Sequence, residues 1–560
     1  MGSKKGIARR AAMRAVVWLT CLSAGVATTA DAHADEIVQG VLQLRWGDAP
    51  RTPQGHAPAP SQFEAWLDAG PGRRYRLDVA QAKRAAGDLY ALSNRRVAVS
   101  YAVRPDVVSG GGKVMSAAAA VPAISAIVPA DRVPQRAVAA EADGRVMAAA
   151  PMVGSTRWVT LMCKFADVAA EQKPRAYFQS QYGNAPGQLG HYWSEVSYGA
   201  IDLEGSSAHG WYVLPKPRSA YVSVVNGRQK ADLSQLFADC TAQAHAEVAF
   251  AGLQGVNLMF NAELDGSAWG GGACAMLDGA YTCTRATWNP PWSFANLAPL
   301  AHEMGHGYGL PHSDNSDGDS DTYDNPWDLM SDAWRRATTD ATYGLLPKHL
   351  NMYQRERLGW VTADRKRTVK ADNRDSHEIA LDVAGLQDSA DAQLVVLAMP
   401  AQPDPYRTVI YTLEARRRHG VYESALAGDA VIIHRVEDYG IARSVDADVP
   451  VADVSSNEGS MLKIGEQWST PDGRHSVEVV AETARGFIIR VGPRPRAMSG
   501  PAPALVSNHA VQQAGVAAGS SSAQVSVVAQ AALPSRVLPR GCRSLPRALR
   551  LPWVCALLAH

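Results

Sequence analysis

The stretch that decides the fold of this 560-residue chain reads His302-Glu303-Met304-Gly305-His306-Gly307-Tyr308-Gly309-Leu310-Pro311-His312. Two histidines four positions apart share one face of a helix, so His302 and His306 can reach the same ion. Gly309 can take the left-handed conformation that ends a helix, and the chain then turns back with His312 as a third ligand. The spacing H-E-x-x-H-x-x-G-x-x-H therefore predicts a metal site with three histidine ligands.

The ligand set also predicts the chemistry of this site. Three neutral imidazoles leave the fourth position of one catalytic Zn²⁺ open to water, and the ion lowers the pKa of that water toward about 7. Glu303 projects to the side of the metal and is the predicted general base. We expect the helix that carries the motif to begin with Ser293 as its N-cap, directly after Pro290-Pro291.

A second motif follows the third histidine. Asp324-Asn325-Pro326-Trp327-Asp328-Leu329-Met330-Ser331 supplies a methionine turn, in which Met330 is predicted to pack beneath the metal without binding it. Together the motifs resemble those of metzincin-clan zinc metalloendopeptidases, in particular the secreted immune-inhibitor-A-like and gametolysin-like proteases. Three further stretches carry the resemblance: His191-Tyr192-Trp193-Ser194-Glu195-Val196-Ser197-Tyr198-Gly199, Gly210-Trp211-Tyr212-Val213-Leu214-Pro215, and Leu350-Asn351-Met352-Tyr353-Gln354-Arg355-Glu356-Arg357-Leu358-Gly359-Trp360.

This resemblance covers residues 155–490 and implies both a fold and an activity. The fold is an α/β (α+β) catalytic domain with a twisted sheet and an active-site helix. The activity is hydrolysis of peptide bonds in a protein or glycoprotein substrate. A histidine at position 312 follows the gametolysin pattern, whereas many immune-inhibitor-A relatives lack it. Tyr343 or Tyr353 could add a hydrogen-bond donor to the oxyanion, as tyrosines of metzincins can.

The N-terminal region has the features of an export signal followed by a small β-rich unit. Five basic residues precede an apolar run from Ala15 to Ala27 and the A-x-A sequence Ala32-His33-Ala34, which predicts a signal peptide over 1–34 and secretion to the periplasm or the extracellular space. A β-rich unit is expected over 35–103, and an Ala/Pro/Gly-rich linker over 104–153. We interpret this region as a propeptide, although a permanent accessory domain has the same features.

Latency through such a propeptide needs a group that covers the metal. No cysteine remains in this region after removal of the signal peptide. We therefore predict inhibition by steric cover or by a carboxylate such as Asp48, within Trp46-Gly47-Asp48, and release by proteolysis inside 104–153.

The rest of the chain divides into a catalytic domain and a C-terminal unit. Residues 154–362 form the predicted zinc metalloprotease domain, 363–492 an antiparallel β-sandwich, and 493–560 a disordered, arginine-containing tail. Hydrophobic periodicity predicts the main elements. They are strands at 157–165 and 255–261, helices at 174–182 and 232–248, and sandwich strands at 393–399, 408–413, 430–436, 476–480 and 486–491.

The cysteines are expected to form disulfides, because an exported protein meets an oxidising compartment. Cys274 and Cys283 flank an Asp-Gly hairpin signal that brings two strands together, so this pair is the first predicted bond. Cys163 with Cys240 is the second and would tie the first strand of the catalytic domain to a helix. Just before the hairpin, Gly270-Gly271-Gly272 is read either as a mobile rim of the cleft or as a plain linker.

An acidic loop lies between the third histidine and the methionine turn. Its carboxylates would repel one another unless they were solvated or bound a hard cation, and oxygen ligands of this density suit Ca²⁺. A calcium site and a solvated acidic loop both fit the sequence. The predicted calcium ligands are Asp317, Asp319, Asp321 and Asp324.

Composition excludes several classes of partner. Lys and Arg together number 55 and Asp and Glu 54, so a formal charge of +1 gives no field that would recruit nucleic acid or a membrane surface. No stretch after the signal is long and apolar enough to span a bilayer, and we expect a monomer. Two rival functions stay open: a secreted host- or glycan-binding, adhesin-like protein with a structural zinc site, and a glycoprotein-specific mucinase.

Overall fold

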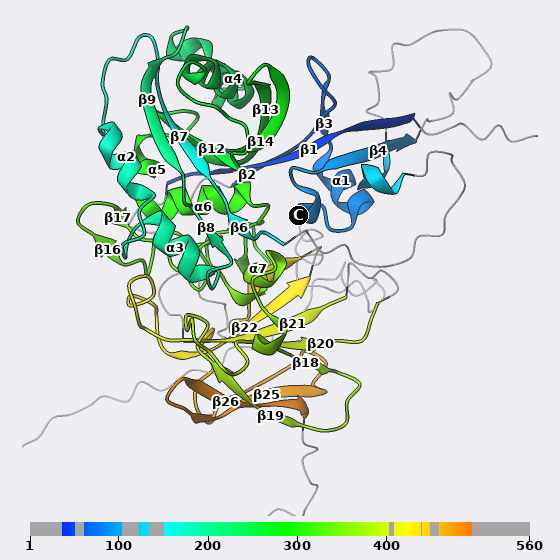
Figure 1. The fold of residues 1–560 in the computed structure, drawn as a ribbon. Helices are drawn as coiled ribbons and strands as arrows, with labels where there is room; N and C mark the ends of the chain where they lie inside the picture. The colour runs from blue at the N-terminus through cyan, green and yellow to red at the C-terminus, as the bar shows by residue number, and fades with distance from the viewer. Residues whose placement is uncertain are drawn as a thin grey trace, which may run out of the picture. The chain divides into compact units, whose positions relative to one another are not determined.

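A computed structural model describes residues 36–50, 61–102, 123–133, 151–402, 408–437, 440–447 and 458–494. The predicted signal peptide, most of the predicted linker and nearly all of the predicted tail lie outside these residues, as do Cys542 and Cys555. The described part is a mixed α/β structure in which strands predominate (Figure 1).

One large sheet carries both the N-terminal strands and the strands that surround the predicted metal motif. Its order is β3-β2-β1-β13-β14-β12-β7-β9, and β4 joins β1 to β5. β1 pairs antiparallel with β13, whereas β12 pairs in parallel with both β7 and β14. The strands are β1 (Glu36–Asp48), β2 (Gln62–Asp68), β3 (Arg74–Leu77), β4 (Arg96–Ala102), β5 (Ala123–Pro129), β7 (Trp158–Lys164), β9 (Ser207–Val213), β12 (Gly255–Phe260), β13 (Ala268–Leu277) and β14 (Ala280–Asn289).

The sheet is covered on both faces because its central strands are apolar on both. In β7, Trp158 and Met162 belong to the core shared with α2, α3 and α6, whereas Val159 and Leu161 belong to the core shared with α4. This is the pattern expected of a buried parallel strand. The helices are α1 (Val79–Ala86), α2 (Arg175–Gln181), α3 (Leu189–Val196), α4 (Leu233–Ala244), α5 (Pro291–Phe294), α6 (Leu297–Gly307) and α7 (Met352–Arg357).

The strands and helices predicted for this region are confirmed in type and place, with one correction at the metal motif. The helix expected to begin at Ser293 is instead two helices. α5 begins at Pro291, with Ser293 inside it, and α6 begins at Leu297 after Asn296. A proline at the first position suits α5, because its missing N–H would have no partner there. The end of α6 agrees with the prediction, since Gly309 has a φ of 90°.

The predicted linker over 104–153 is also partly corrected. β5 lies within it and pairs antiparallel with β4. Its Ile127 is buried in the same core as the other N-terminal strands. The alanine-rich sequence around this short strand hides its alternation, which explains why composition alone predicted a linker.

The C-terminal region consists of two sheets that share one hydrophobic core, but it is not wholly antiparallel as predicted. β15 pairs in parallel with β23, and β18 in parallel with β20. The first sheet has the order β15-β23-β22-β21-β20-β18 and the second β19-β26-β25-β24. Their strands are β15 (Asp314–Asn315), β18 (Lys366–Lys370), β19 (His377–Asp382), β20 (Leu394–Ala398), β21 (Ile410–Arg416), β22 (Ala430–Glu437), β23 (Ile441–Ser444), β24 (Gln467–Ser469), β25 (His475–Glu482) and β26 (Gly486–Pro493).

Short strands and 3₁₀ turns complete the described chain. They are β6 (Gly154–Ser155), β8 (Ile201–Asp202), β10 (Val222–Val225), β11 (Arg228–Ala231), β16 (Thr339–Asp340), β17 (Gly344–Leu345), and the 3₁₀ turns Tyr90–Leu92, Ala130–Arg132, Arg218–Ala220 and Ala363–Arg365. Within the described ranges no helix is long and apolar enough to cross a membrane.

Both predicted disulfides are confirmed. Cys274 lies directly opposite Cys283 across the β13–β14 hairpin, and Cys163 of β7 is bonded to Cys240 of α4. Such bonds persist in oxidising compartments, which agrees with the predicted export.

The glycine run before this hairpin is neither a mobile rim nor a linker, since it lies inside β13. A Cβ on Gly270 would lie 2.3 Å from the carbonyl oxygen of Glu303, and one on Gly271 would lie 2.0 Å from that of Leu44. These glycines therefore let α6 and β1 approach β13 closely.

Candidate metal centre

The three predicted ligand histidines converge on one point. The Nε2 atoms of His306 and His312 are 3.1 Å apart, and all three side chains are buried. Three nitrogens about 2.0–2.1 Å from one ion in a tetrahedral arrangement would be about 3.3 Å from each other. The spacing in this cluster therefore fits a single metal ion.

Backbone carbonyls orient two of these rings. His302 Nδ1 lies 2.7 Å from the carbonyl oxygen of Leu329, and His306 Nδ1 lies 2.8 Å from that of Leu310. A carbonyl can only accept, so each Nδ1 carries a proton, which leaves each Nε2 as the ring nitrogen that could bind an ion. Such hydrogen bonds from the second ring nitrogen are the usual support of a metal-binding histidine.

Asp48 lies on the open side of the three histidines. Its carboxylate is 3.4 Å from His302 Nε2, 3.2 Å from His306 Nε2 and 2.8 Å from His312 Nε2. One oxygen of Asp48 and one ring nitrogen of each histidine lie within 4.8 Å of one another, and all four residues are buried. The four residues could therefore hold a metal ion together.

The last residues of β1 bring Asp48 to this position. β1 crosses from the N-terminal strands to β13 (Figure 1), and its pairing there runs from Arg45 opposite Gly271 to Asp48 opposite Ala268. Two residues before Asp48, the Trp46 ring stacks on the His306 ring, with centroids 4.6 Å apart and planes 4° from parallel. Asp48 is thus held by strand pairing and by stacking.

The electrostatics of the cluster favour a cation. Burial opposes ionisation of Asp48, but the three histidines outweigh it and hold the pKa of its carboxyl well below the usual value. Burial lowers the pKa of His306 to about 3. Asp48 therefore stays ionised, and at least one histidine stays neutral. A divalent ion would stabilise this arrangement.

Glu303 lies beside the cluster on α6 without being part of it. Its side chain is buried, and its Oε2 has no hydrogen-bond partner among the described residues. Burial and the charge of Asp48 raise the pKa of Glu303 well above its usual value. A buried carboxyl without a partner is costly for a fold, so it is characteristic of a functional site.

Met330 of the predicted methionine turn packs against α6, the helix that carries His302 and His306. Its side chain is fully buried, and its Sδ would lie 2.4 Å from a Cβ placed on Gly305 of α6. The glycine between the two helix histidines therefore makes room for this sulfur.

The two tyrosines predicted as oxyanion donors have other partners. The Tyr343 hydroxyl donates to Ser180 Oγ (2.9 Å) and accepts from Gln188 Nε2 (3.1 Å). The Tyr353 hydroxyl has a hydrogen bond with the Arg357 side chain. In the described residues neither hydroxyl has a hydrogen bond to the histidine cluster.

A tyrosine outside the predicted site residues reaches the cluster. The Tyr323 hydroxyl donates to Asp48 Oδ1 at 2.5 Å, and its ring lies edge-on to His312 with centroids 5.5 Å apart. Only its place between His312 and the methionine turn could have marked this residue. Its partner is 275 positions away in the sequence, and no local pattern reveals such a contact.

The acidic loop gathers three of the four predicted calcium ligands. Carboxylate oxygens of Asp317, Asp319 and Asp324 lie within 4.8 Å of one another, whereas Asp321 is not in this group. Asp324 is buried, and Asp317 and Asp319 are exposed.

A small cavity of about 10 Å³ adjoins the histidine cluster. This volume is at the lower limit for one water molecule. Asp48 and Ala49 line it together with His302, Glu303 and Trp334. The end of β1 therefore occupies the space in front of the histidines and Glu303.

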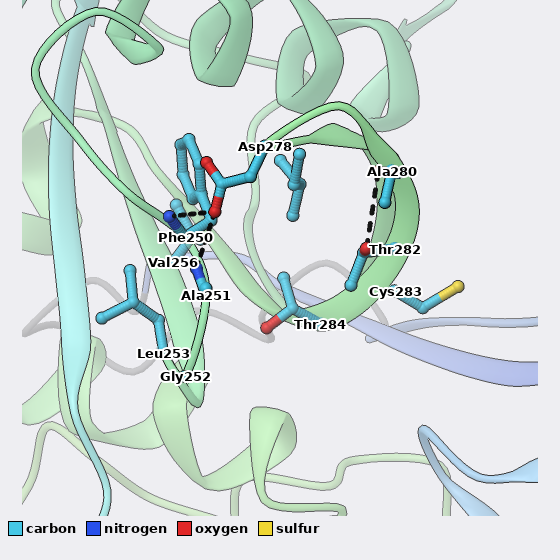
Figure 2. A pocket seen from close by; sticks show the side chains of 11 residues that line it. Phe250, Ala251, Gly252, Leu253, Val256, Asp278, Ala280, Thr282, Cys283 and Thr284 are labelled. Atoms are coloured by element: carbon cyan, nitrogen blue, oxygen red, sulfur yellow. Dashed lines mark hydrogen bonds between the residues drawn. The ribbon is translucent and has the colours of Figure 1, made fainter.

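A larger pocket, of about 250 Å³, lies at the turn of the disulfide-bonded hairpin (Figure 2). Its one carboxylate, that of Asp278, accepts hydrogen bonds from the backbone N–H groups of Phe250 and Ala251, each at 2.8 Å. Because this group already holds the 250–252 loop, the pocket offers no reactive side chain. The candidate site is therefore the histidine cluster.

No model of a known protein family matches the chain, and no curated protein matches it either. The resemblance to metzincins accordingly rests on the motifs quoted above.

Proposed function

We propose that this protein is a secreted zinc-dependent endopeptidase in its latent form. The observation that carries the proposal is the convergence of three buried histidine nitrogens beside Glu303, whose Oε2 has no partner within the described residues. Three neutral imidazoles with one open position are the ligand set of catalytic zinc sites. A protein that only binds a partner has no use for a buried carboxyl beside such a site.

The chain supplies the ligands, the base and the shape of the site. His302, His306 and His312 would hold Zn²⁺, which when bound polarises a peptide carbonyl and acidifies a water molecule. Glu303 would accept the proton of that water on a carboxylate oxygen and pass it to the nitrogen of the leaving amine. Its burial keeps competing solvent away from this proton, and Met330 fixes the helix that carries it.

Latency follows from the position of β1. Asp48 stands where water or a substrate carbonyl would approach the ion, and the remaining cavity of about 10 Å³ cannot admit a peptide. β1 also occupies the edge of β13. Activity would therefore require displacement of β1, for which we propose cleavage within 104–153.

The test of this function is the replacement Glu303→Ala. We expect the variant to retain about one zinc per chain, because Glu303 is not among the ligands, and to lose about 10²- to 10⁴-fold in peptidase rate. Zinc content by elemental analysis and the rate on a quenched peptide would be measured on the processed form of both proteins. Turnover near that of the wild type, or wild-type activity that survives a strong chelator, would refute a zinc peptidase.

One observation favours a second candidate, a binding protein with a structural metal site. Asp48 and the three histidines supply four protein ligands, the number typical of a structural zinc site. The sequence indicated Asp48 only as one way to cover the metal, because this residue precedes His302 by more than 250 residues. On this alternative, loss of Asp48 would weaken metal binding and stability and would never reveal hydrolysis.

A further inference from the structure

The acidic loop contains a buried carboxylate that the proposed peptidase mechanism does not use. Asp324 is 2% exposed. Its Oδ1 accepts a hydrogen bond from the backbone N–H of Asn315 (2.8 Å), but its Oδ2 is buried and has no hydrogen-bond partner in the described residues. A buried carboxylate oxygen without a partner costs free energy unless a cation compensates it.

Two exposed carboxylates, those of Asp317 and Asp319, lie close to the Asp324 carboxylate. Oxygens of Asp317, Asp319 and Asp324 lie within 4.8 Å of one another, and nearby Asp314 and Asp321 add further negative charge. Burial, followed by the charges of these neighbours, raises the pKa of Asp324 to about 8. Mutual repulsion of this kind is relieved when a hard cation bridges the oxygens.

We propose that Asp317, Asp319 and Asp324 form a Ca²⁺ site. Carboxylate oxygens are the ligands that Ca²⁺ prefers, and water can complete its six to eight positions because two of the three residues are exposed. Thiol and imidazole ligands, which would select zinc, are absent from this group of three.

The position of Tyr323 links this site to the cover of the metal centre. Tyr323 directly precedes Asp324, and its hydroxyl donates to Asp48 Oδ1. The neighbouring Thr322 contacts Ser61 of the N-terminal region through its hydroxyl (3.3 Å). Bound Ca²⁺ would therefore hold Tyr323 on Asp48 and slow the release of β1, a consequence that rests on the proposed latent peptidase.

Binding is tested first on the full chain, loaded with one zinc and carrying Glu303→Ala so that it cannot digest itself. Tb³⁺ luminescence sensitised by nearby aromatic rings, its displacement by Ca²⁺, and calorimetric titration with Ca²⁺ would be measured. We expect saturable binding, weakened roughly 100-fold by Asp324→Asn and roughly 10-fold by the exposed Asp319→Asn. The matched control Asp321→Asn removes the same charge from the same loop and should cost less than about fivefold.

Two results would overturn the site: no saturable Ca²⁺ binding by the parent chain, or equal losses in the Asp324 and Asp321 variants. Asp319→Asn is expected to fold even if the buried Asp324→Asn does not, because the Asp319 side chain lies at the surface.

The link to latency is tested on the chain with Glu303 intact. We would follow the appearance of peptidase activity during limited proteolysis, with Ca²⁺ and with a calcium-selective chelator. Removal of Ca²⁺ should accelerate activation roughly tenfold, the effect of losing one hydrogen bond to a charged group. Tyr323→Phe should activate equally fast under both conditions, and a calcium effect that persists in this variant would refute the link. If no peptidase activity appears at all while Ca²⁺ still binds, the proposed function fails and the site stands.

Discussion

The buried histidines of the histidine cluster and the buried His434 of the C-terminal sheet have opposite surroundings. In the metal centre, His302 and His306 each have Nδ1 on a backbone carbonyl, and their Nε2 atoms converge with that of His312. His434 of β22 is equally buried, but neither of its ring nitrogens has a hydrogen-bond partner within the described residues. Burial alone therefore does not make a histidine a ligand.

The difference lies in what surrounds each ring. A carbonyl fixes the tautomer and direction of the cluster histidines, so that their lone pairs meet at one point. His434 lies opposite Thr412 and Ser444 in the C-terminal sheet, and neither of its ring nitrogens is hydrogen-bonded within the described residues. The cluster could therefore hold a cation, whereas His434 only adds a group that must stay neutral.

The largest expected effect comes from breaking the convergence. His306→Ala should lose the metal and lower peptidase activity of the processed form by at least about 10³-fold, because the ion supplies the acidified water. His434→Gln should retain about one zinc per chain and an activity within about twofold of the wild type, since it lies outside the ligand set. Zinc content and rate would be measured for both, and equal metal loss would show that burial matters more than convergence.

Removal of the fourth side chain of the cluster should have a smaller effect in the opposite direction. Asp48→Ala in the full-length chain should raise peptidase activity roughly 10- to 100-fold, the value of one buried hydrogen-bonded charge. Asp48→Asn, which preserves shape but not charge, should give an intermediate rise. Uncleaved protein would be assayed on a quenched peptide. Loss of zinc without any gain in rate would instead favour the structural metal site.

The sequence revealed the histidines because helical spacing is local, but it could not reveal most of their surroundings. Positions 302, 306 and 312 are related by a helix and one turn, and Cys274 and Cys283 by a two-residue hairpin, so patterns within about ten residues suffice. Asp48 was selected only as one option for latency. Its approach to the cluster depends on pairing of β1 with β13 across more than 200 residues.

The two wrong predictions, at Ser293 and at the glycine run, also arise from contacts between residues far apart in the sequence. Ser293 was chosen as an N-cap from its residue type, but the chain bends between α5 and α6, where the loop meets residues near Tyr343 and Gly344. Gly270 and Gly271 suggested a loop, whereas tertiary contacts with α6 and β1 require glycine inside a strand. At these positions tertiary packing, and not the intrinsic preference of the residue type, determines the secondary structure.

The isolated histidine should make the fold sensitive to acid. Burial lowers the pKa of His434 to about 4 from 6.5. Between these values the unfolded chain binds the proton and the folded chain does not, so stability falls as the pH decreases below 6.5. The difference between the two pKa values corresponds to at most about 3 kcal/mol of unfolding free energy.

His434→Leu removes this linkage. Urea denaturation at pH 7 and pH 4.5 should show a smaller loss of unfolding free energy in the variant than in the wild type. The exposed His245→Leu is the control and should keep the wild-type pH dependence. An unchanged pH dependence in His434→Leu would mean that His434 is not the responsible group.

The smallest effect concerns the floor beneath the cluster, and its sign depends on Met330. Gly305→Ala should gain up to about 1 kcal/mol from helix propensity. However, the new Cβ would lie 2.4 Å from the buried Met330 Sδ, so overpacking should cost about 1–3 kcal/mol and leave the variant less stable. In a Met330→Ala background the sulfur is gone, and the same Gly305→Ala change should become stabilising. A double-mutant cycle by urea denaturation measures this reversal. If Gly305→Ala has the same effect in both backgrounds, Met330 does not pack against the turn of α6 that places His302 and His306 on one face.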